Sequence, residues 1–163
     1  MPLSDGDAAT EGDVWFRVLT EESYIRKGRI HHSAFTGKAI GRPDSAKSRS
    51  WSHELSGRLR SRSADDILPA AIAYCEEVSR KAKQKKDFAG VMFTRVADAR
   101  KSFGKISIDV HYTPLEADPS HSDLTFTGLT EPDMRDLVYK FPDLVFGLHP
   151  SQLALLPRAI GGE

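Results

Sequence analysis

The sequence contains a single cysteine, Cys75. One cysteine excludes an internal disulfide and any zinc cage built from several thiolates. No apolar run approaches the roughly 20 residues that a membrane-spanning helix needs. The polar, acidic N-terminus also lacks the pattern of a signal or transit peptide. These absences predict a cytoplasmic protein with no membrane partner.

Motifs for common cofactors are missing as well. The chain has no Gly-X-Gly-X-X-Gly and no P-loop, so dinucleotide and ATP binding in those forms are not indicated. Ser33 lies in no Gly-X-Ser-X-Gly elbow. Cys75 falls in the apolar stripe of an expected helix, as is typical of a core residue. No histidine pair has the i, i+4 spacing of a helical zinc site. We therefore predict no cofactor and assign no metal ligand.

What the chain does have is segregated charge. Its 163 residues carry 23 Lys and Arg against 23 Asp and Glu, so the formal net charge is zero. Residues 26–62 hold ten basic residues against two acidic ones, a net charge of +8. Residues 1–25 have a net charge of −5 and residues 106–163 one of −6. Such segregation can attract phosphate groups, or the two poles can pair within the fold. Both alternatives stay open.

The length of the chain suits one domain with its own core. Apolar runs and alternating patterns predict strands at residues 14–19, 89–96, 106–112 and 123–127. Helical spacing predicts a long helix after residue 65, a short one around 97–103 and another from residue 131. Strands and helices do not alternate regularly. This order predicts an α+β fold with a small mixed or mainly antiparallel sheet, one long helix and two or three short helices.

The organisation along the chain follows from composition. Residues 1–12 are predicted to be a flexible acidic leader, residues 13–158 a single globular domain, and residues 159–163 a flexible tail. Within the domain, residues 36–63 are predicted to form a long basic loop. A short strand or helical turn around Trp51–Leu59 is the alternative for part of that loop.

Three short motifs follow one another along the chain. They are Arg-Ile-His-His-Ser-Ala-Phe at residues 29–35, Gly-Val at residues 90–91 and Glu-Ala-Asp-Pro-Ser-His at residues 116–121. With these motifs, the chain resembles a family of uncharacterised bacterial proteins with a Ser-Ala-Phe … Asp-Pro-X-His pattern. The resemblance implies no activity. It points to four positions to examine: Ser33, Phe35, Pro119 and His121.

The basic segment carries the strongest functional signal. Guanidinium groups match phosphates bidentately, and an aromatic ring between them can stack on a base or anchor the segment in the core. We predict a phosphate-binding set made of Arg42, Arg49, Trp51, Arg58, Arg60 and Arg62. The alternatives are a solvated basic loop and a docking strip for an acidic protein partner.

Histidines supply a second candidate chemistry. A metal-free nuclease needs a general base, a general acid and a cation that stabilises the charged phosphorane. His31, His32 and His121 are the candidate catalytic residues, with an arginine of residues 42–62 as the cation. Asp109 and His111 share one face of an expected strand. They form either a further acid–base pair or an ordinary solvent face.

Together these observations predict a phosphate-directed binding module for nucleic acid or a nucleotide, acting as a component of a bacterial system. One alternative is a metal-free ribonuclease, or another phosphate-ester enzyme that uses histidines. The other is an adaptor or inhibitory subunit that docks a protein partner through its charged surfaces. Whether the protein is an enzyme, and its oligomeric state, stay open.

Overall fold

The computed structural model describes residues 3–20, 25–26, 29–31, 53–60, 67–81, 85–101, 107–116, 118–127, 131–140 and 145–148. Its centre is a six-stranded sheet in the order β6-β7-β4-β1-β5-β8, and each neighbouring pair is antiparallel. The strands are β1 (Val14–Leu19), β4 (His53–Leu59), β5 (Gly90–Arg95), β6 (Ser107–Tyr112), β7 (His121–Thr127) and β8 (Phe146–Leu148). Two short strands, β2 (Ile25–Arg26) and β3 (Arg29–Ile30), pair separately.

Three helices accompany the sheet in the described part of the chain: α1 (Ile67–Lys81), α2 (Val96–Arg100) and α3 (Glu131–Lys140). The expected α+β class with a mainly antiparallel sheet is confirmed. None of the described helices is both long and apolar enough to cross a membrane.

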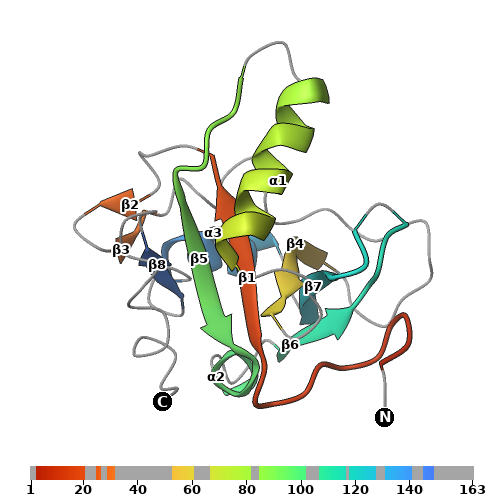
Figure 1. The fold of residues 1–163 in the computed structure, drawn as a ribbon. Coiled ribbons are helices and arrows are strands. Elements are labelled where there is room, and N and C mark those ends of the chain that lie inside the picture. Colours follow the sequence, from red (N-terminus) through yellow and green to blue (C-terminus); the bar gives the residue numbers. More distant parts are fainter. Residues whose placement is uncertain are drawn as a thin grey trace.

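Helix α1 lies across β1 and β5 on one face of the sheet (Figure 1). The helical spacing of its apolar residues turns Ala71 and Cys75 inward. They pack against the alternate residues of the two strands that face them, which are Val14, Phe16, Val18, Val91 and Phe93. The basic residues Arg80 and Lys81 in the last turn complement the helix dipole.

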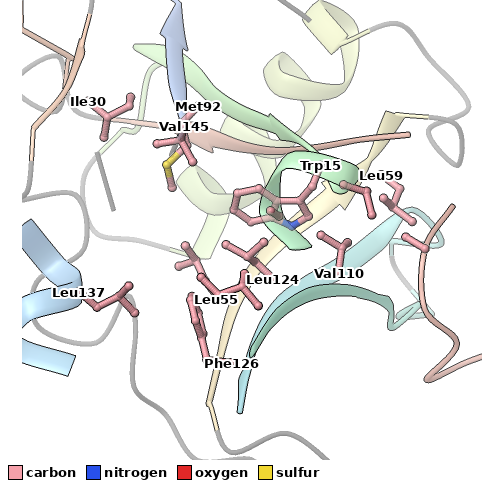
Figure 2. Packing of buried hydrophobic residues seen from close by; sticks show 14 of the residues in the cluster. Trp15, Ile30, Leu55, Leu59, Met92, Val110, Leu124, Phe126, Leu137 and Val145 are labelled. Carbon is pink, nitrogen blue, oxygen red and sulfur yellow. The ribbon is translucent and has the colours of Figure 1, made fainter. Parts of the chain in front are cut away.

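The opposite face of the sheet carries the larger core, centred on Trp15 (Figure 2). Trp15 is fully buried, and its indole Nε1 donates a hydrogen bond to the Ser122 carbonyl at 3.2 Å. Helix α3 contributes Leu137 to this cluster, and α2 contributes Val96 and Ala99. The sheet therefore separates two apolar layers, one of which covers only part of its face.

Strand β4 lies within the segment predicted as a long basic loop, where a short strand or helical turn around Trp51–Leu59 was the alternative. His53–Leu59 forms a strand between β1 and β7, inside the sheet. Leu55 and Leu59 point into the larger core, and Gly57 is the inward position between them. A Cβ at Gly57 would lie less than 3 Å from three atoms of the Trp15 ring. The missing side chain of Gly57 therefore makes room for Trp15.

The segment predicted as an acidic leader lies along β6. The Gly6 amide donates to the Tyr112 carbonyl at 2.7 Å, the Tyr112 amide donates to the Asp7 carbonyl at 2.8 Å, and the Ala9 amide donates to the Val110 carbonyl at 2.8 Å. Ala9 is buried in the larger core. These contacts cover the outer edge of β6 with backbone from the start of the chain.

Candidate functional site

The α1 side of the sheet changes from apolar to polar between β1 and β4. Opposed residues on four adjacent strands form one row, in the order Phe93, Phe16, Arg58, His121. Directly opposed residues of a sheet point to the same face. The first two are fully buried in the apolar layer beneath α1. The last two carry a guanidinium and an imidazole, so the polar half of the face begins at β4.

Arg58 is held by three residues, one in the loop between β6 and β7 and two in α1. Its Nε donates to Asp118 Oδ2 at 2.8 Å, and its Nη1 donates to the Ala70 carbonyl of α1 at 2.9 Å. The guanidinium carbon also lies 5.3 Å from the centre of the Tyr74 ring, within the range of a cation–π interaction. Nη2 has no hydrogen-bond partner among the described residues. The guanidinium is thus fixed in orientation, with one amino group left for a ligand.

A small pocket lies where β1 and β4 separate. Beyond the pair of Phe16 and Arg58, the Ser56 carbonyl accepts a hydrogen bond from Arg17 Nη1 at 2.6 Å instead of from a strand amide. The pocket has a volume of about 50 Å³. A water molecule needs about 10–15 Å³ of free volume, so this space accepts a few waters or one phosphate-sized group. Its polar lining consists of Arg17, Ser56, Arg58, Tyr74, Asp118 and His121.

The imidazole of His121 belongs to a hydrogen-bonded network. Its Nδ1 lies 2.8 Å from the Thr113 carbonyl and 3.1 Å from the Thr113 hydroxyl. That hydroxyl donates to Asp123 Oδ2 at 2.9 Å. The second carboxylate oxygen, Asp123 Oδ1, is buried without a hydrogen-bond partner in the described part of the chain. It lies 4.0 Å from His121 Nε2.

The structure brings together two of the residues that the sequence predicts for the site. Arg58 and His121 are direct cross-strand neighbours and line the same pocket. Arg60 is exposed just after β4, and His31 follows β3. The other predicted site residues, and two positions of the family resemblance, lie outside the described residues: His32, Arg42, Arg49, Trp51, Arg62, Ser33 and Phe35. Pro119 lies beside the site, and its carbonyl accepts a hydrogen bond from the Tyr112 hydroxyl at 2.8 Å.

Sequence reasoning missed Arg17, Tyr74, Thr113, Asp118 and Asp123. Asp123 begins the expected strand of residues 123–127, and it shares a face with His121 only because β7 starts two residues earlier than expected. Asp118 belongs to the Asp-Pro-Ser-His motif, but its arginine partner lies 60 positions away in the sequence. Local patterns do not predict such a contact.

Asp109 and His111, considered from the sequence as an acid–base pair, bind to different partners. Asp109 Oδ1 accepts a hydrogen bond from Arg100 Nε at 2.7 Å, whereas His111 Nδ1 lies 2.7 Å from the Thr125 hydroxyl. Neither residue lines the pocket. Among the described residues, no group of three or more His, Cys, Asp or Glu side chains is arranged to hold a metal ion.

Cys75 lies on the apolar side of this boundary, within the layer under α1. Burial raises the pKa of its thiol, and the Asp87 carboxylate raises it further, against a smaller opposing effect of Arg58. A raised pKa keeps the thiol protonated and poorly nucleophilic. This environment fits the core role expected from the sequence.

The chain matches no protein-family model, no curated protein and no solved structure. The function of the pocket is therefore inferred from its geometry and chemistry.

Proposed function

We propose that the protein is a phosphate-directed binding module for nucleic acid or a nucleotide, working in the bacterial cytoplasm. The observation that carries this proposal is the pocket lined by Arg17, Arg58 and His121. The lining contains two arginines and a histidine but only one acidic residue, Asp118. Guanidinium donors that are held in place bind phosphate more strongly than mobile ones, because less side-chain freedom is lost on binding.

The size of the pocket limits what enters it. A volume of about 50 Å³ accepts one phosphate group, so the sugar and base of a nucleotide would lie outside it. Arg60 is exposed one residue beyond the end of β4 and is available to a second phosphate. The predicted phosphate-binding residues of the basic segment would extend this contact along the ligand.

A docking role through apolar surface has less support. The large exposed hydrophobic residues of the described chain are Ile72, Leu115 and Tyr139. They lie on α1, on the loop between β6 and β7, and on α3. Three such side chains offer little apolar area for a protein interface in the described part of the chain.

The proposal is tested by fluorescence anisotropy with labelled RNA and DNA oligonucleotides and a labelled adenine nucleotide, from about 20 mM salt upward. We expect binding whose affinity falls steeply with salt, because phosphate contacts release counterions. Arg58→Gln should weaken binding at least about tenfold, in line with the loss of a charge-assisted hydrogen bond, and Arg60→Gln should weaken it less.

Arg95→Gln is the matched control. Arg95 loses the same charge on substitution, but it pairs with Asp98 at 2.8 Å outside the pocket. Its variant should bind as the parent protein does. Because Arg58 also tethers Asp118, circular dichroism must show that Arg58→Gln is folded. Absence of binding to every probe at low salt would exclude the proposed function.

A further inference from the structure

The proton on the His121 ring can be assigned from its neighbours. The Thr113 carbonyl only accepts hydrogen bonds, and it lies 2.8 Å from Nδ1. The Thr113 hydroxyl gives its own proton to Asp123 Oδ2, so it too is an acceptor towards Nδ1. Nδ1 therefore carries a hydrogen, and in the neutral ring Nε2 has a bare lone pair.

That lone pair faces a second acceptor. Asp123 Oδ1 lies 4.0 Å from Nε2, too far for a direct hydrogen bond. The Asp123 side chain is only 5% exposed, and Oδ1 has no partner among the described residues. An unpaired buried acceptor destabilises the fold, because it loses its hydrogen bonds to water. Oδ1 is enclosed, whereas His121 lines the pocket, so a hydroxyl in the pocket can donate a hydrogen bond to Nε2.

The position of His121 indicates which hydroxyl. His121 is the direct cross-strand neighbour of Arg58, and both line the pocket. A phosphate bound to Arg58 at the mouth of the pocket would therefore bring its adjoining groups close to His121. In a ribonucleotide, the 2′-hydroxyl stands beside the 3′-phosphate.

We propose that the protein cleaves RNA at this site, with His121 as the general base; this inference rests on the proposed phosphate-binding function. His121 Nε2 takes the proton of the 2′-hydroxyl, the 2′-oxygen forms a bond to phosphorus, and the bond from phosphorus to the 5′-oxygen breaks. The 5′-oxygen takes a proton from water, and the resulting hydroxide takes the proton from His121. The products are a 2′,3′-cyclic phosphate and a 5′-hydroxyl.

Two other residues support this step. Arg58 binds the phosphoryl oxygens, on which negative charge grows in the transition state. Asp123 is a positioning residue, since its carboxylate stabilises the imidazolium that forms when His121 accepts the proton. Thr113 fixes the ring and the carboxylate relative to each other, because its carbonyl binds the His121 ring and its hydroxyl binds Asp123.

The test uses the full chain with a labelled RNA oligonucleotide and its fully 2′-deoxy counterpart. We expect the RNA to be cut to cyclic-phosphate ends and the deoxy oligonucleotide to be bound but left intact. His121→Gln should reduce cleavage at least about 100-fold, the lower range for loss of a general base. Circular dichroism like that of the parent protein, with retained though weaker binding of the deoxy oligonucleotide, shows that the variant folds.

His111→Gln, prepared in the same way, is the matched control. His111 lies on the neighbouring strand and bonds to Thr125 outside the pocket, so cleavage should persist in this variant. Binding of RNA without cleavage would overturn the inference and leave the proposed function intact. Cleavage that survives in His121→Gln would also overturn it. If the parent protein neither binds nor cleaves the RNA, both proposals are overturned.

Asp123→Asn tests the positioning residue. Asparagine keeps the shape of the side chain and an acceptor for Thr113, but it removes the negative charge. We expect kcat to fall about tenfold, roughly the effect of 1.4 kcal/mol on the barrier, with KM unchanged within about twofold. An unchanged kcat, or a rise in KM alone, would exclude this role for Asp123.

Discussion

The α1 side of the sheet has an apolar half under α1 and a polar half on β4 and β7. The side chains of the two halves are buried in different ways. Under α1, Phe16 and Phe93 lie among other apolar side chains and are fully buried. On β7, Asp123 and Thr125 are buried too, and hydrogen bonds to Thr113 and to the Asp109 carbonyl compensate for part of their burial, while Asp123 Oδ1 has no partner among the described residues. Apolar burial adds stability in proportion to area, whereas a buried hydrogen bond adds little net free energy. The first half therefore supports the fold, and the second is available for chemistry.

The largest expected effect tests this division directly. Phe93→Ala should lower the free energy of unfolding by about 3–5 kcal/mol, because it removes buried surface and leaves a cavity. Thr125→Val, an isosteric change in the polar half, should cost about 1–3 kcal/mol through the unpaired groups it leaves. Urea denaturation with matched m-values measures both. Equal losses in the two variants would contradict the division of roles.

A smaller effect is expected at the boundary between the halves. Gly57→Ala would place a methyl group against the Trp15 ring, and overpacking of this kind costs about 1–3 kcal/mol. Gly12→Ala is the control, because a Cβ at Gly12 meets no atom within 4 Å. Thermal and urea unfolding should show a loss for the first variant and a change within about 0.5 kcal/mol for the second. A tolerated Gly57→Ala would mean that Trp15 does not depend on this gap.

The smallest effect concerns Cys75 under α1. Burial raises the pKa of this thiol, so the folded protein keeps the proton at a pH where the unfolded chain releases it. The stability contributed by the protonated thiol is complete below about pH 8.5, the ordinary thiol pKa, and declines as the pH rises through the raised value. Between about pH 8 and pH 10, the free energy of unfolding should fall more steeply for the parent protein than for Cys75→Ala. Parallel curves would show that the thiol is not excluded from water.

Sequence reasoning located most of the sheet but offered β4 only as an alternative to a loop. Strand β1 falls at the predicted residues 14–19, and β5, β6 and β7 begin or end within two residues of the expected bounds. Runs or alternation of apolar side chains in the local sequence predict these strands. In β4 the same alternation is interrupted at Gly57, whose space is filled by Trp15 from another strand. A pattern completed by a distant residue is not visible in the local sequence.

Long-range contacts also explain why the candidate site was predicted only in part. His121 and Arg58 were each selected by residue type, but their juxtaposition depends on the register between β4 and β7. The two carboxylates that interact with these residues were missed. Asp118, in a loop, accepts a hydrogen bond from Arg58, and Asp123 is linked to His121 through hydrogen bonds of Thr113. Charge counting predicts an anion site in the basic segment, whereas the pairing of strands determines which two basic groups meet.

The backbone bonds between the start of the chain and β6 bear on how the protein behaves in concentrated solution. A sheet edge with unpaired amides and carbonyls is a template for strands of other chains and hence for aggregation. Residues 6–9 occupy that edge, from Gly6 on Tyr112 to Ala9 on Val110. A purification tag fused ahead of Met1 leaves this cover in place. Proteolysis or truncation beyond Ala9 removes it and opens the edge to self-association.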